Sequence, residues 1–423
     1  MRLIFLALML IPAAVAGAAD PRLIYHSATD QGQEIWSSGA DTLFNPASVV
    51  KVATTLLALE RLGPESRYLT TFGCRGPCGV EEGRLIGDLV VAGGGDPDFH
   101  PENAWLVAHE LRRLGIQSIT GDLVITGSFW MGWEHGVEGR EMDLERRSML
   151  TGGRLRAALD PELWNQTLKA TWEDAAPRHG WNEASPPAVR IGGSVSAEVE
   201  DREKTVQILE HRSNPLRVIL RRFNTFSNND IVRIAQPFGG PRAVQAFLRA
   251  LSGGLQGRVE VATASGEKVN RMTARQVIRL LWALRDLGLR LGFEPADLFP
   301  VPGCDPGPTP RMFPRLAEGP AARTAVVKTG TLTNTDGGVA VLAGYFESKT
   351  RGPVAFCVAA PGAGGELRKW RLVEQEWLLD LMAFLGGALP YECGAALPLS
   401  DAFAQVKVIR KEPPAENDEP DHG

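Results

Sequence analysis

Apolar and polar residues recur along the chain with spacings that predict both helices and strands. Helical periodicity, often bounded by glycine or proline, predicts helices over 49–59, 101–114, 215–226, 242–251, 273–289 and 366–385. Short apolar or alternating runs predict strands over 23–26, 34–36, 68–72, 85–92, 121–125, 188–191, 205–209, 324–327, 338–346 and 354–359. The last two runs are apolar enough for a sheet that is covered on both faces.

The predicted helix that follows Phe44 carries a serine and a lysine on one face. Pro46 suits the first helical turn, so Ser48 is expected in that turn and Lys51 follows three residues later. A serine at a helix N-terminus has backbone N–H groups and the positive end of the helix dipole beside it. A lysine that is desolvated by an apolar helix can lose its proton and act as a base. The spacing therefore predicts a nucleophile–base pair.

Two further motifs make this pair more specific. Ser-x-x-Lys alone is weak, because a second copy, Ser265 to Lys268, lies in a polar stretch with no apolar helix behind it. Ser227-x-Asn229 and Lys328-Thr-Gly330 each occur once, the latter at the end of a predicted strand. In this order the three motifs resemble the active-site set of class A β-lactamases and penicillin-binding proteins. A coincidental set of polar loop residues is the alternative.

The similarity extends beyond the three motifs. Segments 46–51, 87–97, 211–229, 265–271 and 328–345 resemble the D-alanyl-D-alanine carboxypeptidase/endopeptidase family of class C penicillin-binding proteins, over roughly residues 24–385. The resemblance implies an α+β fold: a penicillin-binding/β-lactamase-like transpeptidase domain, with an antiparallel sheet flanked by helices, split by a large, strand-rich insertion. It also implies a serine-type carboxypeptidase or endopeptidase that acts on peptidoglycan stem peptides and is acylated by β-lactam antibiotics. It implies no metal and no cofactor.

The resemblance assigns catalytic roles to five residues. Ser48 is expected to attack the substrate carbonyl, with Lys51 as its base. Ser227 is expected to relay a proton to the leaving nitrogen, and Asn229 to hold Lys51 and the substrate backbone. Lys328 is expected to supply a second cation that favours the neutral form of Lys51.

Substrate binding is assigned to the strand that carries Lys328. This lysine and the hydroxyls of Thr329 and Thr331 are expected to hold a substrate carboxylate, with Gly330 between them. The backbone N–H groups of Ser48 and Thr331 are expected to form the oxyanion hole.

The sequence departs from the family pattern at two places near these motifs. Asn228 stands where the family usually has aspartate, at a position with no assigned catalytic role, so activity is expected to survive. Thr263-Ala264 stands where the family usually has Asp-Gly, which leaves the contribution of that loop to the site open.

The motif positions predict the domain organisation. Residues 20–65 and 210–409 are expected to form the catalytic domain and residues 66–209 the inserted domain, with 130–185 as an inner subdomain that is reduced in size. A basic residue, an apolar core of about 13 residues and small residues over 1–19 predict a secretory signal peptide and a periplasmic protein. The polar segment 410–423 is expected to be disordered.

Composition narrows the functions further. The 423 residues carry a formal net charge of −5, which gives no reason to expect nucleic acid as a partner, and no later apolar run is long enough to span a membrane. Five cysteines fit an oxidising compartment. Cys74 and Cys78 flank a turn-like tripeptide and are spaced for a small disulfide, whereas the pairing of Cys304, Cys357 and Cys393 is not readable.

Two other functions remain open. A β-lactamase shares the three motifs, but the long insertion is unlike the compact β-lactamase plan. A catalytically weak wall-binding scaffold protein would keep the fold without the chemistry. The intact motif residues argue against the scaffold.

Overall fold

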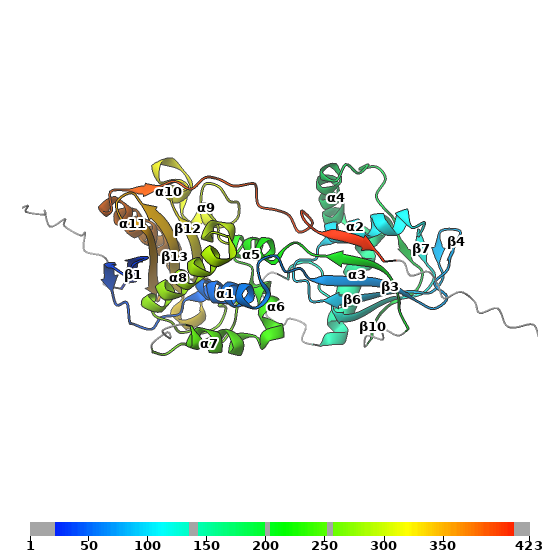
Figure 1. The fold of residues 1–423 in the computed structure, drawn as a ribbon, viewed down its shortest axis with the longest axis horizontal. Helices are drawn as coiled ribbons and strands as arrows, with labels where there is room; N and C mark the ends of the chain where they lie inside the picture. The colour runs from blue at the N-terminus through cyan, green and yellow to red at the C-terminus, as the bar shows by residue number, and fades with distance from the viewer. Residues whose placement is uncertain (1–21, 135–142, 199–203, 252–256, 410–423) are drawn as a thin grey trace, which may run out of the picture.

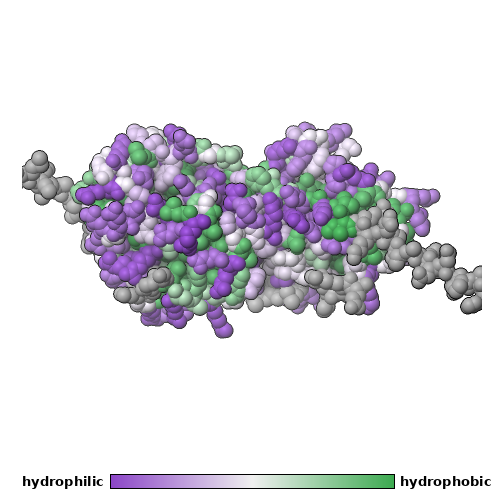
Figure 2. Space-filling model, viewed as in Figure 1, coloured by the Kyte–Doolittle hydropathy of each residue, from purple (hydrophilic) through white to green (hydrophobic). Residues whose placement is uncertain are grey.

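A computed structural model describes residues 22–134, 143–198, 204–251 and 257–409. Figure 1 shows two lobes side by side, and hydrophilic side chains are spread over the surface of both (Figure 2). The predicted signal peptide and the predicted disordered tail lie outside the described residues. Within the described part of the chain, no helix is long and apolar enough to cross a membrane.

The first lobe is built on an antiparallel sheet in the order β12-β13-β14-β1-β2, with β15 paired to β13. The strands are β1 (Ile24–Thr29), β2 (Glu34–Ser38), β12 (Val326–Leu332), β13 (Val339–Ser348), β14 (Gly352–Pro361) and β15 (Ala388–Leu389). Side chains alternate between the two faces of the sheet. Val341 packs in the hydrophobic core on one face of the sheet, and its neighbour Leu342 packs in the hydrophobic core on the other face.

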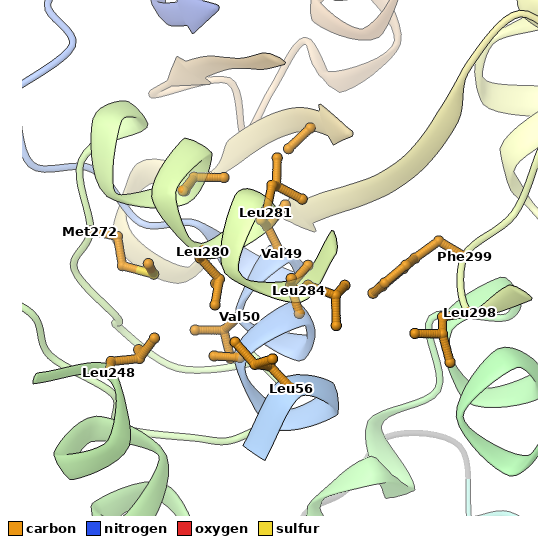
Figure 3. Packing of buried hydrophobic residues seen from close by; sticks show 14 of the residues in the cluster. Val49, Val50, Leu56, Leu248, Met272, Leu280, Leu281, Leu284, Leu298 and Phe299 are labelled. Carbon is orange, nitrogen blue, oxygen red and sulfur yellow. The ribbon is translucent and has the colours of Figure 1, made fainter. Parts of the chain in front are cut away.

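Helices cover both faces of this sheet. The helices of the lobe are α1 (Lys51–Leu62), α5 (Leu216–Thr225), α6 (Val232–Ala235), α7 (Pro241–Ala250), α8 (Ala274–Leu291), α9 (Thr309–Met312), α10 (Pro314–Ala317) and α11 (Leu367–Phe384). Helix α8 begins at a capping box of Thr273 and Gln276 and ends at Gly292 in the left-handed conformation. Figure 3 shows Val50 and Leu56 packed against Leu280 and Leu284 of α8, which fixes α1 against that helix.

The second lobe contains a mixed sheet in the order β10-β8-β6-β3-β11-β16. Its strands are β3 (Leu69–Arg75), β6 (Asp88–Gly94), β8 (Leu123–Ser128), β10 (Val195–Ala197), β11 (Val206–Arg212) and β16 (Gln405–Val408), of which β6, β8 and β10 are parallel. A small sheet comprises β4 (Val80–Glu81), β5 (Arg84–Leu85), β7 (Ser118–Ile119) and β9 (Arg190–Ile191). Helices α2 (Pro101–Arg113), α3 (Leu144–Leu159) and α4 (Gln166–Arg178) complete the lobe.

Two strand pairings cross the predicted domain boundaries. Residues 405–408 fall in the range assigned to the catalytic domain, yet β16 pairs with β11 in the sheet of the second lobe. Strand β11 begins at Val206 and continues across the predicted boundary at 210, because its partner β3 extends equally far. The segment 130–185, read as an inner subdomain, contains α3 and α4 in its described part. The division into domains is otherwise still a prediction.

Each lobe contains one disulfide. Cys74 and Cys78 are bonded in the second lobe, four residues apart. Cys304 is bonded to Cys393 across 89 residues of the first lobe, and Cys357 is a buried free thiol in β14.

Candidate active site

Ser48 lies in a tight turn immediately before α1. The turn is a 3₁₀ segment over Ala47–Val50, and α1 proper begins at Lys51, so the helix starts later than Pro46 predicted. The reason is Ala47, whose φ of 47° is left-handed and incompatible with an α-helical first turn. The Asn45 side chain accepts a hydrogen bond from the Ala47 N–H at 3.1 Å and helps to hold this conformation.

Two glycines allow other segments to approach the Ser48 turn closely. A Cβ atom on Gly330 would lie 2.6 Å from the Pro46 carbonyl oxygen, and one on Gly266 would lie 2.1 Å from that of Ala47. Any larger residue at either position would force the backbone apart. The two glycines therefore bring β12 and the 263–270 loop against the turn that carries the serine.

Lys51 is completely buried and has three hydrogen-bond acceptors. Its Nζ donates to Ser48 Oγ at 2.8 Å, to Asn229 Oδ1 at 2.7 Å and to the Ser265 carbonyl oxygen at 2.6 Å. Burial, followed by the positive charge of Lys328, lowers the pKa of Lys51 well below the ordinary lysine value. The environment thus favours a neutral amine beside the serine hydroxyl.

The second and third motifs meet on the other side of the site. Lys328 is 2% exposed, and its Nζ donates to Ser227 Oγ at 2.8 Å. Burial lowers the pKa of Lys328 to about 7. Ser227 has a left-handed φ of 50° at the end of α5, and this backbone turn leads into the segment that carries Asn229. The structure therefore brings together all five residues predicted as catalytic.

The strand that carries Lys328 is longer than predicted. It continues to Leu332, so Thr329, Gly330 and Thr331 lie within β12, because β13 pairs with the whole segment. Thr331 Oγ1 accepts a hydrogen bond from Arg371 Nη2 of α11 at 3.1 Å. The three predicted substrate-binding residues thus lie on an edge strand beside the Ser48 turn.

The chain was compared with known proteins. The model of the D-Ala-D-Ala carboxypeptidase 3 (S13) family matches residues 16–149 and 186–371, which is most of the sequence. The chain belongs to this family. The match confirms the resemblance inferred from the motifs.

Curated relatives of this S13-family chain are distant. Carboxypeptidase DacB of Mycolicibacterium smegmatis is 26% identical over 377 residues, covering 79% of this chain and 75% of the relative. D-alanyl-D-alanine carboxypeptidase DacB of Haemophilus influenzae is 31% identical over 108 residues, covering 26% of this chain. That alignment spans only 22% of the Haemophilus protein.

Solved structures share the fold of the S13-family chain. The predatory endopeptidase Bd0816 of Bdellovibrio bacteriovorus superimposes with a TM-score of 0.73 at 20% identity, covering 90% of this chain and 98% of that one. The endopeptidase Bd3459 of the same organism, solved in a penicillin G-acylated form, gives a TM-score of 0.69 at 21% identity, with the same coverage. These matches confirm the predicted α+β, penicillin-binding-like fold.

The 263–270 loop contributes to the site through its backbone, which sequence reasoning did not predict. Thr263 Oγ1 accepts hydrogen bonds from the N–H groups of Gly266 and Glu267, at 2.9 and 3.0 Å, and so holds the loop where the family usually has aspartate. The loop presents the Ser265 carbonyl oxygen to Lys51. The second Ser-x-x-Lys copy thus lies beside the site, but its serine side chain is buried and bonded within the loop.

Two other residues near the site have defined contacts. Asn228 Oδ1 accepts a hydrogen bond from the Asp230 N–H at 2.8 Å and caps the short 3₁₀ turn that follows, which explains why asparagine serves there. Arg371 was not predicted, because its contact with Thr331 depends on the packing of α11. Among the described residues, no group of three or more His, Cys, Asp or Glu side chains is placed to hold a metal ion.

Proposed function

We propose that this chain is a serine-type peptidase that cleaves D-Ala-D-Ala, or the D-amino-acid cross-link, in peptidoglycan through an acyl-enzyme on Ser48. The observation that carries the proposal is the buried Lys51, hydrogen-bonded at 2.8 Å to Ser48 Oγ and favoured in its neutral form. A neutral amine at this distance is an efficient base for a hydroxyl nucleophile.

In the proposed reaction, Lys51 accepts the Ser48 hydroxyl proton while Oγ bonds to the substrate carbonyl carbon. The backbone N–H groups of Ser48 and Thr331 stabilise the oxyanion that develops. The C–N bond then breaks, and the Ser227 hydroxyl, held by Lys328 at 2.8 Å, passes a proton to the leaving amine. Water attacks the ester in the second half of the reaction, with the same groups acting in reverse, and the product acid leaves.

The substrate carboxylate is proposed to bind at β12. Lys328 and the hydroxyls of Thr329 and Thr331 line the strand, and Arg371 adds a guanidinium at 3.1 Å from Thr331 Oγ1. Glu374, whose carboxyl group also acts on Arg371, is fully buried, and burial raises the pKa of Glu374 well above the usual range. A C-terminal carboxylate fits this cationic edge.

The proposed partners follow from the site and from the relatives. Peptidoglycan stem peptides are the proposed substrates, and β-lactams, which acylate Bd3459, are proposed to acylate Ser48. Such a substrate requires that the protein act outside the cytoplasm, which agrees with the predicted signal peptide and periplasmic location.

Covalent labelling with a fluorescent penicillin tests the proposal, with Ser48→Ala and Ser265→Ala compared side by side. Both serines begin a Ser-x-x-Lys sequence, but Ser265 contacts Lys51 only through its carbonyl oxygen, which alanine retains. We expect stable labelling of the wild type and of Ser265→Ala, and none of Ser48→Ala. Release of D-alanine from a pentapeptide muropeptide then tests the carboxypeptidase form.

Other outcomes would favour the other functions. Rapid nitrocefin turnover would indicate a β-lactamase. A folded chain that binds glycan without forming a penicillin adduct would indicate a scaffold protein.

Arg371→Ala tests carboxylate recognition separately. Loss of one charge-assisted contact is expected to raise KM about tenfold for a substrate with a free C-terminal carboxylate. The change should be much smaller for the same peptide ending in an amide, and Arg371→Lys should restore part of the loss. An equal effect on both peptides would show that Arg371 acts only on folding or on the position of Thr331.

A further inference from the structure

A cavity of about 770 Å³ lies between the two lobes, and none of the motif residues lines it. Its second-lobe wall comes from the ends of β6 and β8, at Gly94, Gly95 and Ser128, and from the first turns of α3. Its first-lobe wall comes from α6 and the turn after it. The carboxyl ends of adjacent parallel strands are a common place for ligands, and the volume is sufficient for a short peptide.

A tryptophan held by two guanidinium groups forms one side of the cavity. The Arg147 guanidinium lies 4.2 Å from the centre of a Trp130 ring, and that of Arg233 lies 4.1 Å from a Trp130 ring. Both arginines are more than nine-tenths buried, at 8% and 6% exposed. Trp130 comes from the second lobe and Arg233 from α6 of the first, so both lobes build the site.

The two arginines differ in how their donors are used. Arg233 donates to the Gly132 carbonyl oxygen at 3.2 Å and pairs with Glu134 and Asp230, each at 3.6 Å. Arg147 forms no ion pair with a described residue, and its buried Nε has no hydrogen-bond acceptor. Since an unpaired buried charge is costly, the surroundings of Arg147 favour an anionic partner.

The local charge balance has the sign that an anion requires. Arg147, Arg154 and Arg233 share two buried or half-buried carboxylates, Glu134 and Asp230. On the rim, Glu198 is paired with Arg75. Glu145 is exposed to solvent, which screens its charge. Among the residues that the structure describes, Arg147 is the arginine of this group that has no carboxylate partner.

We propose that this cavity binds the carboxylate of a second peptidoglycan peptide while the first occupies the Ser48 cleft. The fork of Arg147 donates two hydrogen bonds to the carboxylate, and the apolar and backbone surfaces around Trp130 hold the rest of the peptide. The assignment of a wall peptide rests on the proposed function. A cross-linked substrate contains two such peptides, so this second site favours cross-linked over uncross-linked stem peptides.

The experiment uses the full chain with the catalytic cleft filled. Ser48 is first acylated with penicillin G, as checked by mass, and a stem tetrapeptide is then titrated by calorimetry. We expect binding to the acylated protein that weakens at least tenfold in Arg147→Gln. Arg146→Gln, the exposed neighbour on the same helix, is the matched control and should bind as the wild type does. Arg147→Lys keeps the charge and should retain part of the affinity.

Three results would overturn the proposal. Equal affinity of Arg147→Gln and the wild type for the tetrapeptide would show that Arg147 does not bind it. Equal affinity of the wild type for the tetrapeptide and for the same peptide with all its carboxylates amidated would show that the carboxylate is not recognised. Binding of inorganic phosphate as tight as that of the peptide would show a general anion site.

Failure of acylation would count against the proposed function alone. The same titration would then be run in the Ser48→Ala protein. There, the comparison of Arg147→Gln with Arg146→Gln still tests whether the cavity binds the peptide.

Discussion

The sheets of the two lobes differ in how far their two faces are buried. In the first lobe, nearly every residue of β13 and β14 is buried, because helices cover both faces. In the second lobe, the residues of β3 and β11 alternate between buried and more exposed, because one face lies on the helices and the other carries an open hollow. Lys51 of α1 and Lys328 of β12 are both buried in this lobe, and burial is the largest cause of their lowered pKa values.

The second lobe also buries a titratable group, but without the surroundings of a reactive one. His211 is fully buried, and burial lowers its pKa to about 3. Its Nε2 lies 3.1 Å from Asn103 Nδ2, and in the described part of the chain the ring has neither a nucleophile nor a second cation as a hydrogen-bond or ion-pair partner. Burial alone therefore does not make a reactive site; the pairing of a desolvated base with a hydroxyl does.

The largest expected effect separates these two buried groups. Lys51→Met should lower the rate of penicillin acylation by roughly 10³-fold, since the base for Ser48 is lost. His211→Phe in the second lobe should change the rate less than about twofold if the protein folds, because the ring takes no part in acylation. Stopped-flow acylation of both variants, with circular dichroism as the control for folding, makes the comparison. Acylation of Lys51→Met at a rate close to that of the wild type would refute the assignment of Lys51 as the base.

The next effect concerns the two disulfides. Replacing Cys304 and Cys393 together by serine should lower the free energy of unfolding by roughly 4–5 kcal/mol, since their bond closes a loop of 89 residues. The same change at Cys74 and Cys78 should cost roughly 2 kcal/mol, because that loop spans only four residues. Urea unfolding measures both. Equal losses would show that chain entropy does not explain the stabilisation.

Per pH unit, the smallest effect is a difference in pH dependence between the lobes. Burial lowers the pKa of Lys328 to about 7 in the native state, whereas an unfolded lysine has a pKa of about 10.5. The unfolded state therefore binds more protons between these values, and stability should rise with pH by up to about 1.4 kcal/mol per unit. Native His211 is neutral down to about pH 3, so its contribution should rise between pH 3 and 6.5 and be complete above that.

Variants assign each window to its residue. Urea unfolding of Lys328→Met, relative to the wild type, should lose the rise above pH 7, whereas His211→Phe should lose the rise below pH 6.5. Lys369→Met on α11, whose lysine side chain is 55% exposed, is the control and should run parallel to the wild type. Parallel curves for Lys328→Met would show that this lysine keeps its proton in the native state.

The sequence predicted that Ser48 and Lys51 lie side by side, because motif and local structure coincide there. Ser48 and Lys51 lie within one turn, and helical spacing alone brings them together. The left-handed Ala47 was not predictable, because its conformation depends on the close approach of Gly266 and Gly330 from distant parts of the chain.

Tertiary contacts account for the other omissions. The Ser265 carbonyl oxygen has no signature in the side-chain sequence, since any residue provides a backbone acceptor. Arg371 meets Thr331 only because α11 packs on the sheet. Strand β16 has only four residues, which is too short a run for its pairing with β11 to be predicted from a hydrophobic pattern.

The return of the chain to the second lobe at β16 has a mechanical consequence. Three stretches of backbone now connect the lobes: the one before β3, the one after β11 and the one leading to β16. A single proteolytic cut in any one of them would leave the lobes joined by the other two. Removal of the last strand would expose the hydrogen-bonding edge of β11, a template on which other chains can pair. The C-terminal segment thus both connects the two lobes and covers the edge of β11. We expect self-association to be the first effect of its loss.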